Sequence, residues 1–560
     1  MLLDLHLVFI RARFKDFRAP QSRGDYIVTE IRVRCGQPEL VQSRFLWMFA
    51  VILVWAALLG LYVARQPFPV SSSANAAAAE PMTIVGIYVH GFFLSLAVGL
   101  PYVVMSLEAL GIIRKDKQYA EAARHISIVW AISFGFGAVT GTLVEFGLVQ
   151  IWSGVTLAIG SFFFIPLVFE VFAFLLEVAF LALYLYTWGR MKSQWLHWIL
   201  GVFLLVGSSS SAVLILAANS WMQTPWGAGS LVQTILPWSP VMGPSAVNAT
   251  ALVTLYKTLP KTGSLVMASP SVISSLGYLL YDPYVALLNP NAIVTAAHTV
   301  LTTIVIAAFE NAAIFSYGYL KGNGGKEAMF LKTVKFSYGV GALATLLTIV
   351  SGDQMARIVY SYQYVKFLSM EGFRGGIDPI IGLISNFNPN YIFPTFGDLA
   401  VTAGKSIDPA TASLTIDKAE QIMPVLSTLY YSMIISGALL LVFSLAYLGL
   451  FSRRVDQLVR VVIRMPTERF VLYSSFVAAL LGIVAGSAGW AVRELGRQPW
   501  TIYGLIRPEQ LITPNPITPL FSYFIILVEA MTFTCGIVAL YFIPTKSLME
   551  IAKEVEVVRG

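Results

Sequence analysis

Long apolar runs separated by short polar segments dominate the chain. Each run is long enough to cross a bilayer at about 1.5 Å of helix per residue. The runs cover residues 45–64, 83–112, 126–150, 156–188, 196–221, 290–319, 329–350, 424–452, 469–493 and 517–543. This pattern predicts an all-α fold, a polytopic transmembrane bundle of about ten helices. The longest runs exceed the hydrocarbon thickness, so we expect those helices to tilt or to extend beyond it.

Loops that are rich in lysine and arginine alternate along the chain with loops that contain few of them. Both residue types are frequent in residues 1–44 and in the loops after the runs that end near residues 112, 188, 319, 452 and 543. The positive-inside rule therefore predicts a multi-pass plasma-membrane protein with both termini in the cytoplasm. The long loops 222–289 and 351–423 are then external.

The first apolar run stands apart from the others. We expect a cytoplasmic basic head at residues 1–44, an extra transmembrane helix at 45–65 and an external flexible linker at 66–82, because residues 71–81 read SSSANAAAAEP. A helical bundle at 83–545 and a cytoplasmic tail at 546–560 follow. The alternative is a long signal segment, residues 1–79, that is cleaved after an Ala-x-Ala site.

The composition narrows the functional classes. Of the 560 residues, 57% are hydrophobic and only 12% are charged, whereas soluble domains carry roughly 25% charged residues. The formal net charge of +7 resides in short loops between apolar runs, so we expect no nucleic-acid partner. Cys35 and Cys535 are the only cysteines, which excludes a disulfide framework and a cysteine-based metal site.

Ionisable side chains interrupt several apolar runs, where charges are costly and commonly functional. They are Glu108, Glu145, Glu170, Glu177, Glu310, Glu494 and Glu529, together with His90 and His298. Any one of them could instead be a helix end at the interface or a neutral acid with a hydrogen-bond partner.

Four side chains are predicted to lie at similar depth in the outer half of the membrane. His90, His298 and Met433 each come a few turns after a run begins on the external side, and Glu494 ends a run that leads there. Imidazole, thioether and carboxylate groups all bind haem iron. The sequence therefore predicts a haem site, although a lone histidine or methionine in an apolar run is commonly only a core residue.

Five segments resemble subunit I of cytochrome bd quinol oxidase. They are GWAVRELGRQPW (489–500), LLNPNAIVTAAHTV (287–300), LILAANSWMQTP (214–225, with Ser220 for a glycine), VHGFFLSLAVGL (89–100) and GTLVEFGLVQIW (141–152). The similarity runs from about residue 82 to 545. It implies nine family helices, to which the first apolar run is an addition, and Glu108 keeps the family's distance from His90.

The resemblance implies three haems in this chain. His298 and Met433 would be the axial ligands of a low-spin haem b, which transfers electrons only. His90 and Glu494 would each serve one of two high-spin haems, a haem b and a haem d. Arg497, one turn beyond Glu494, would pair with a haem propionate, and Trp490 would belong to the same binding surface.

The resemblance also implies a quinol site and a proton path. Lys366 and Glu371, five residues apart in QYVKFLSMEG (363–372), would bind quinol; the alternative is an amphipathic surface helix with solvated charges. Glu170 and Glu177 share a helix face and would relay protons, although the family pair is eight apart rather than seven. Glu108, Ser211 and Asn219 would serve this path, or the two polar residues would only join helices. Glu145 would be a catalytic residue, together with Glu170, Glu177 and Arg497.

The implied function is a terminal respiratory oxidase subunit. It would oxidise quinol outside, reduce O2 to water with cytoplasmic protons and build a membrane potential without pumping. Partners would be a homologous subunit II, a small single-helix subunit and membrane lipid. The family's arginine two residues before the Met ligand is Tyr431 here, and its lysine three before the low-spin His is Thr295. A paralogue with another electron donor and a proton-coupled secondary transporter remain alternatives.

Overall fold

The computed structural model describes residues 38–65, 74–245, 283–321, 326–450 and 465–559, with residues 452, 454, 456 and 457 between the last two ranges. Most of the predicted basic head, residues 66–73 of the predicted linker and much of the first external loop lie outside the described residues. The choice between a retained helix and a cleaved signal segment is therefore not addressed by the structure.

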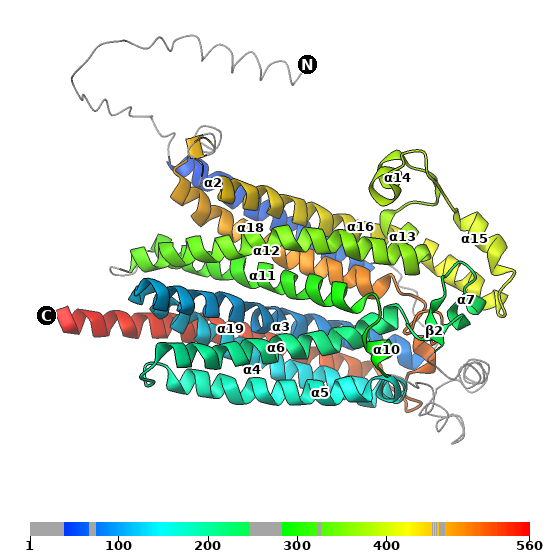
Figure 1. The fold of residues 1–560 in the computed structure, drawn as a ribbon, viewed down its shortest axis with the longest axis horizontal. Helices are drawn as coiled ribbons and strands as arrows, with labels where there is room; N and C mark the ends of the chain where they lie inside the picture. The colour runs from blue at the N-terminus through cyan, green and yellow to red at the C-terminus, as the bar shows by residue number, and fades with distance from the viewer. Residues whose placement is uncertain are drawn as a thin grey trace, which may run out of the picture.

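Long helices lie roughly side by side along one direction (Figure 1). They are α2 (Pro38–Arg65), α3 (Ala74–Arg114), α4 (Lys117–Gln150), α5 (Ser153–Thr187), α6 (Gln194–Gln223), α11 (Ala292–Lys321), α12 (Glu327–Tyr362), α16 (Pro409–Gly449), α18 (Thr467–Leu495) and α19 (Pro519–Arg559). Within the described part of the chain, nine of them are long and apolar enough to cross a membrane, and α2 contributes the shorter apolar stretch Trp47–Val63. The predicted all-α membrane bundle is confirmed.

Short elements gather at one end of the bundle, which we call the loop end (Figure 1). They are β1 (Ala228–Gly229), α7 (Leu231–Ile235), β2 (Met242–Ser245), α10 (Pro283–Leu287), α13 (Tyr364–Glu371), β3 (Gly376–Ile377), α14 (Pro379–Asn386), β4 (Ile392–Phe393) and α15 (Phe396–Ala403). The strands form two antiparallel pairs, β1 with β2 and β3 with β4. Both predicted external loops thus contribute to the same end.

The predicted flexible linker is wrong from residue 74 onward, because α3 already begins at Ala74. Alanine has the highest helix propensity of all residues, and Ala76 and Ala79 are fully buried. The Asn75 side chain also stabilises the first turn of α3, because its Nδ2 donates to the main-chain oxygen of Thr513 at 2.9 Å. A hydropathy pattern alone does not register these local preferences.

The second external loop is shorter than predicted. Helix α12 continues to Tyr362 and α16 begins at Pro409, so the connection spans residues 363–408 instead of 351–423. Asp408 caps α16 by accepting a hydrogen bond from the Thr411 amide at 3.1 Å, and proline at the first helical position favours a helix start. The Asp-Pro pair was a readable signal that hydrophobicity alone overlooked.

Helix α18 occupies a central position, since it packs against α11, α16 and α2 and touches α12. Close approach elsewhere depends on small residues: a Cβ on Gly99 of α3 would lie 2.2 Å from the Thr303 main-chain oxygen of α11. The central helix carries Glu494 near its C-terminal end, and this places the candidate site at the loop end.

Candidate functional site

The last two turns of α18 contact the helices that carry the predicted haem ligands. The Tyr88 hydroxyl of α3, two residues before His90, donates to the Ser487 main-chain oxygen at 3.1 Å. A Cβ on Gly489 would lie 2.9 Å from the Met433 sulfur of α16. Arg493 donates to Thr295 of α11 at 3.0 Å. Residues 487–494 span only about 10 Å of helix, so the four predicted ligands occupy one narrow layer of the bundle.

Each histidine ring is held through its Nδ1 atom. His90 Nδ1 lies 3.1 Å from the Gly137 main-chain oxygen, and His298 Nδ1 lies 3.0 Å from the Ser351 hydroxyl. A metal-binding histidine commonly uses one ring nitrogen for such a bond and offers the other to the metal. The arrangement therefore suits Nε2 as the ligand atom of both residues.

Three of the predicted ligands face a glycine on a neighbouring helix. A Cβ on Gly141 would lie 2.9 Å from His90 Cε1, and one on Gly352 would lie 3.3 Å from His298 Cε1. Gly489 stands in the same relation to Met433. A side chain at any of these glycines would press on the ring or thioether that faces it.

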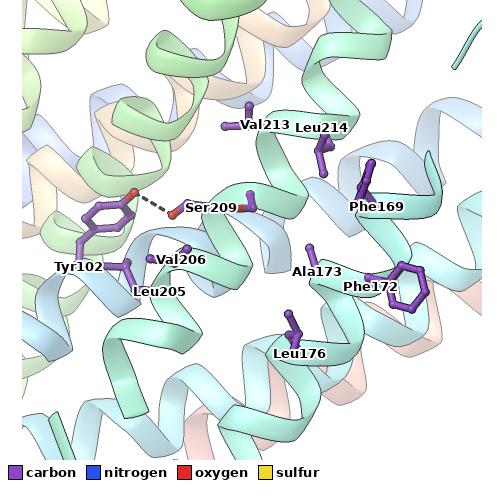
Figure 2. Close-up of a pocket in the computed structure, with 11 residues that line it drawn as sticks. Tyr102, Phe169, Phe172, Ala173, Leu176, Leu205, Val206, Ser209, Val213 and Leu214 are labelled. Atoms are coloured by element: carbon purple, nitrogen blue, oxygen red, sulfur yellow. Dashed lines mark hydrogen bonds between the residues drawn. The ribbon is translucent and has the colours of Figure 1, made fainter. Parts of the chain in front are cut away.

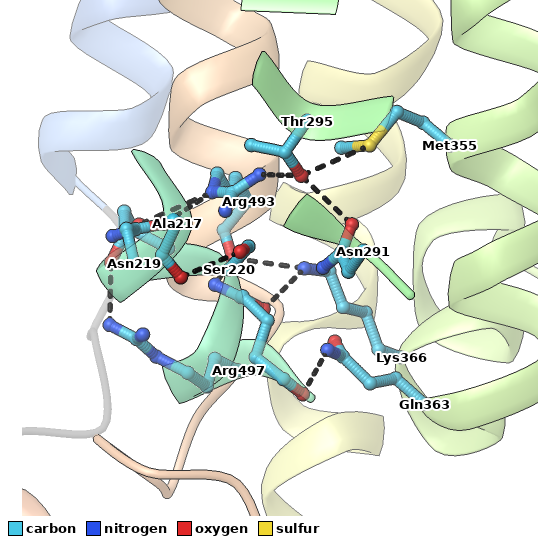
Figure 3. Close-up of polar contacts among 12 residues, drawn as sticks. Ala217, Asn219, Ser220, Asn291, Thr295, Met355, Gln363, Lys366, Arg493 and Arg497 are labelled. Atoms are coloured by element: carbon cyan, nitrogen blue, oxygen red, sulfur yellow. Dashed lines mark hydrogen bonds and ion pairs between the residues drawn. The ribbon is translucent and has the colours of Figure 1, made fainter. Parts of the chain in front are cut away.

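Glu494 lies among buried cations that include Arg493, Arg497 and Lys366, all three labelled in Figure 3, and it is the only carboxylate in this cluster among the residues that the structure describes. Its Oε2 accepts from Arg497 Nη2 at 2.6 Å, and its Oε1 accepts from Asn219 Nδ2 at 3.1 Å. Arg493 Nε lies 4.0 Å from Oε1. Asn219, which was predicted for the proton path, lies beside Glu494 in this cluster. Lys366, Arg493 and Arg497 are each less than 9% exposed, so this cluster carries more positive than negative charge.

Several donors of this cluster have no hydrogen-bond partner among the described residues. They are Arg493 Nη2, Arg497 Nε and Nη1, and Trp490 Nε1, all buried. A buried charge is tolerated when it is paired and hydrogen-bonded, and a guanidinium fork matches a carboxylate. The residues present therefore fit the propionate groups of haem, together with the imidazole, thioether and carboxylate ligands nearby.

Lys366 of α13 points into the bundle (Figure 3). Its Nζ donates to the Arg493 main-chain oxygen at 2.9 Å and to Gln223 Oε1 at 3.2 Å. Burial, reinforced by the charge of Arg493, lowers the pKa of Lys366 to about 7. Because residues 365–370 are all buried, a surface helix with solvated charges does not describe this lysine.

Glu371 faces a different helix from Lys366. Its Oε1 accepts from the Tyr430 hydroxyl at 2.9 Å and its Oε2 from the Tyr431 hydroxyl at 3.2 Å. Burial raises the pKa of Glu371. The two predicted quinol residues therefore do not touch each other: Lys366 faces α6 and α18, whereas Glu371 faces α16. Tyr431, which departs from the family pattern, contacts Glu371 directly.

The predicted proton residues are only partly brought together. The Ser211 hydroxyl donates to Glu170 at 2.7 Å, which joins α5 to α6. Glu177 is buried at 5% exposure on the same helix as Glu170. Glu145, predicted as a catalytic residue, lies on the exposed side of α4.

Sequence reasoning missed a buried cluster around Glu108. His197 Nδ1 lies 2.6 Å from Glu108 Oε1, and the Tyr184 hydroxyl donates to Glu108 Oε2 at 2.7 Å. The second ring nitrogen of His197 lies 3.0 Å from the Tyr184 main-chain oxygen. A signal existed, because His197 is an ionisable residue at the start of an apolar run. Arg493 and Gln223 were also missed, since only the folded chain brings them to Glu494 and Lys366.

An open apolar cavity of about 710 Å³ lies between α5 and α6. Figure 2 shows Phe169, Phe172 and Leu176 on one side and Val206 and Val213 on the other. Its polar boundary is Tyr102, whose hydroxyl pairs with Ser209 at 2.9 Å. The cavity suits an apolar molecule and borders the helix faces that carry Glu170 and Glu177.

Comparison with known proteins agrees with the resemblance. The family model described as "Cytochrome bd terminal oxidase subunit I" matches residues 79–547. The chain belongs to this cytochrome bd subunit I family. It is 25% identical over 446 residues to the cytochrome bd ubiquinol oxidase subunit 1 of Bacillus subtilis (strain 168), covering 76% of this chain and 83% of that protein.

A second relative and a solved structure extend the comparison. The cytochrome bd-II ubiquinol oxidase subunit 1 of Escherichia coli (strain K12) is 26% identical over 284 residues, half of this chain and 47% of that protein. The structure of bd oxidase from Geobacillus thermodenitrificans has the same fold, with a TM-score of 0.62 at 20% identity, covering 83% of this chain and 96% of that chain.

Two further acids of the chain stand outside the clusters described above. Glu529 of α19 is buried, and a Cβ on Gly86 of α3 would lie 2.4 Å from its Oε1. The Oε2 atom of Glu529 and the Oε1 atom of Glu310 have no hydrogen-bond partner among the described residues. Glu529 therefore lies at the contact between α19 and α3.

Proposed function

We propose that this chain is the haem-bearing subunit of a quinol:oxygen oxidoreductase in the plasma membrane. The observation that carries the proposal is the excess of buried cations and unpartnered donors around Glu494, in the layer that holds His90, His298 and Met433. Membership of the terminal oxidase family supports the same conclusion, and the relatives above bear the name ubiquinol oxidase.

The cofactors are a low-spin haem b, a high-spin haem b and a haem d. His298 and Met433 hold the first, and His90 and Glu494 serve the other two. When bound, these groups supply one-electron transfer and an iron that binds oxygen. Arg497 and Trp490, whose buried donors have no partner among the described residues, would donate to the propionate oxygens of a bound haem.

Quinol oxidation takes place at α13. A charged Lys366 holds a quinol oxygen and favours loss of its proton, because a nearby cation stabilises the anionic ring. Glu371 has a raised pKa, which suits a group that must accept a proton near neutral pH. Tyr430 and Tyr431 donate to its two oxygens and so fix the position of this proton acceptor.

Protons for water formation come from the opposite end of the bundle. The Glu108, His197 and Tyr184 cluster is followed along α5 and α6 by Tyr102 with Ser209, by Glu177 and by Glu170 with Ser211. His197 and Ser211 are 14 residues apart (211 − 197), about 21 Å of helix. This row of hydroxyl, imidazole and carboxyl groups leads toward the Glu494 layer. The departure of the Glu170 spacing from the family is compatible with this role, since Ser211 reaches it directly.

The proposed membrane orientation follows from the distribution of lysine and arginine among the loops, and the proposed partners follow from the family. Both termini face the cytoplasm, and the loop end faces outward. The protein works with a homologous subunit II and a small single-helix subunit in the lipid bilayer. Release of quinol protons outside and uptake inside build a membrane potential without pumping.

The test is oxygen uptake by the purified complex with reduced quinols. We expect uptake that depends on added quinol, falls in Lys366→Met and Glu371→Gln, and is unchanged in Lys418→Met, a partly exposed lysine of α16 whose Nζ donates to Gln421. Ubiquinol and menaquinol analogues identify the donor. Haem-containing complex that takes up no oxygen with either quinol would contradict the proposal and favour another electron donor.

A further inference from the structure

Arg493 is a buried guanidinium that is held from two sides by neutral groups. Its Nε donates to Asn219 Oδ1 at 2.5 Å and its Nη1 to Thr295 Oγ1 at 3.0 Å. The Thr295 hydroxyl donates its hydrogen bond to Asn291 Oδ1 at 2.8 Å. Its oxygen therefore acts as the acceptor for Arg493. The guanidinium is therefore fixed in place (Figure 3).

The charge of Arg493 is only partly offset by the described residues. The nearest carboxylate oxygen, Glu494 Oε1, lies 4.0 Å from its Nε, and that carboxylate is already paired with Arg497 at 2.6 Å. Nη2 of Arg493 is buried without a partner among the described residues. A buried N–H in this state needs an acceptor at Nη2, and the positive charge of the guanidinium favours an anionic one.

Unpartnered donors form a stripe along α18. Trp490 Nε1, Arg493 Nη2 and the free Arg497 nitrogens recur at spacings of three and four residues, which places them on one face of the helix and its continuation. The Arg493 guanidinium carbon lies 6.0 Å from the Trp490 ring centre. One face thus presents several donors to the same region, and a planar carboxylate can accept from two of them.

We infer that Arg493 binds a propionate carboxylate of the haem held by His298 and supplies the fixed positive charge at that haem. The inference rests on the proposed function, because it requires a haem at His298. Thr295, which receives the Arg493 hydrogen bond, lies three residues before His298 on the same helix. Positions 295 and 431, where the family pattern would place cations, hold neutral Thr and Tyr. With neutral side chains at positions 295 and 431, the buried cation in contact with Thr295 is Arg493 of α18.

A fixed cation beside a haem stabilises the reduced iron relative to the oxidised iron, because reduction removes one positive charge. Optical redox titration of the purified complex measures this effect. We expect Arg493→Gln to lower the midpoint potential of the low-spin haem by 59 mV or more, which is a tenfold change in the reduction equilibrium of a one-electron couple. Arg493→Lys retains the charge and should recover most of the potential.

Two further variants separate charge from packing. Arg469→Gln removes an exposed arginine from the first turn of the same helix, and the midpoint should not change. Thr295→Lys, added to Arg493→Gln, returns a cation from α11 and should raise the potential again. If Arg493→Gln does not assemble, Thr295→Val, which removes only the positioning hydroxyl, is expected to lower the midpoint by a smaller amount.

The outcomes distinguish this inference from the proposed function. A wild-type complex without haem overturns both. A haem-loaded Arg493→Gln complex with an unchanged midpoint overturns the role of Arg493 and leaves the oxidase intact. An unchanged midpoint in Thr295→Val, where the glutamine variant fails to assemble, has the same meaning.

Discussion

The ammonium group of Lys366 donates a hydrogen bond to the main-chain oxygen of Arg493 at 2.9 Å. This bond joins α13, the proposed quinol segment, directly to the helix residue that precedes Glu494. A quinol held by Lys366 would therefore lie beside the layer of candidate haem ligands. Electron transfer from donor to haem needs no intervening domain in this arrangement.

The first prediction concerns the charge of Lys366. Lys366→Met should raise the KM for quinol by about 10-fold or more, since a hydrogen bond to a charged group contributes about 1.5–3 kcal/mol. The optical spectrum should remain that of the wild type, because the side chain holds no iron. Steady-state kinetics with several quinol concentrations measure the effect. A normal KM in this variant would remove Lys366 from the quinol site.

The second prediction is a pH dependence of quinol binding. The pKa of Lys366 is lowered to about 7, so its charge is present below pH 7 and is lost as the pH rises through that value. The KM for quinol should therefore increase between about pH 6 and 8. In Lys366→Met this dependence should disappear. Glu371→Gln serves as the control for the second titrating group, and the rise should persist there.

The third prediction concerns the tyrosines at Glu371. Tyr431→Phe and Tyr430→Phe each remove one hydrogen bond to the carboxylate, at 3.2 and 2.9 Å. A single such bond contributes about 0.5–1.5 kcal/mol, so the KM for quinol should rise about 2- to 13-fold in each. If the KM for quinol in both variants equals that of the wild type, these phenols do not position Glu371 for the reaction.

The fourth prediction tests the row of proton-carrying groups. Glu177→Gln should slow reoxidation of the reduced enzyme by oxygen about 100-fold, the lower limit for loss of a positioned proton donor, while the KM for quinol stays constant. Rapid-mixing absorbance measures the rate. Glu145→Gln is the matched variant, because Glu145 lies on the exposed side of α4; it should slow the reaction less. A normal rate in Glu177→Gln would place the path elsewhere.

The fifth prediction uses glycines that face the candidate ligands. Gly489→Ala would put a methyl group 2.9 Å from the Met433 sulfur, whereas Gly437→Ala on α16 meets nothing within 4 Å. Overpacking costs about 1–3 kcal/mol, so the first variant should weaken retention of the low-spin haem about 5- to 150-fold. Haem extraction and the reduced spectrum measure this loss. The Gly437 variant should retain all its haem.

The sequence predicted the main helices because an apolar run of transmembrane length has few alternative structures. It failed at residues 74–82 and at the ends of the second external loop, where alanine propensity and an Asp-Pro cap extend helices beyond the apolar runs. Those signals are local and were present in the sequence.

The site was predictable only in part. Glu494, Arg497 and Lys366 were identified, and the structure places them in one cluster. Asn219 was assigned to the proton path, but its neighbours are Glu494 and Arg493. Arg493 and Gln223 were not predicted as site residues, because their roles depend on contacts between helices that are distant in sequence. A single sequence carries no direct record of such contacts.

The most direct measurement is the dithionite-reduced minus oxidised optical spectrum of the purified complex, combined with haem extraction. The account predicts low-spin b bands together with the red-shifted band of a chlorin-type haem, and Met433→Leu should remove the low-spin bands alone. A complex that contains no haem would contradict the ligand assignment, and the buried glutamates would then point to proton-coupled transport.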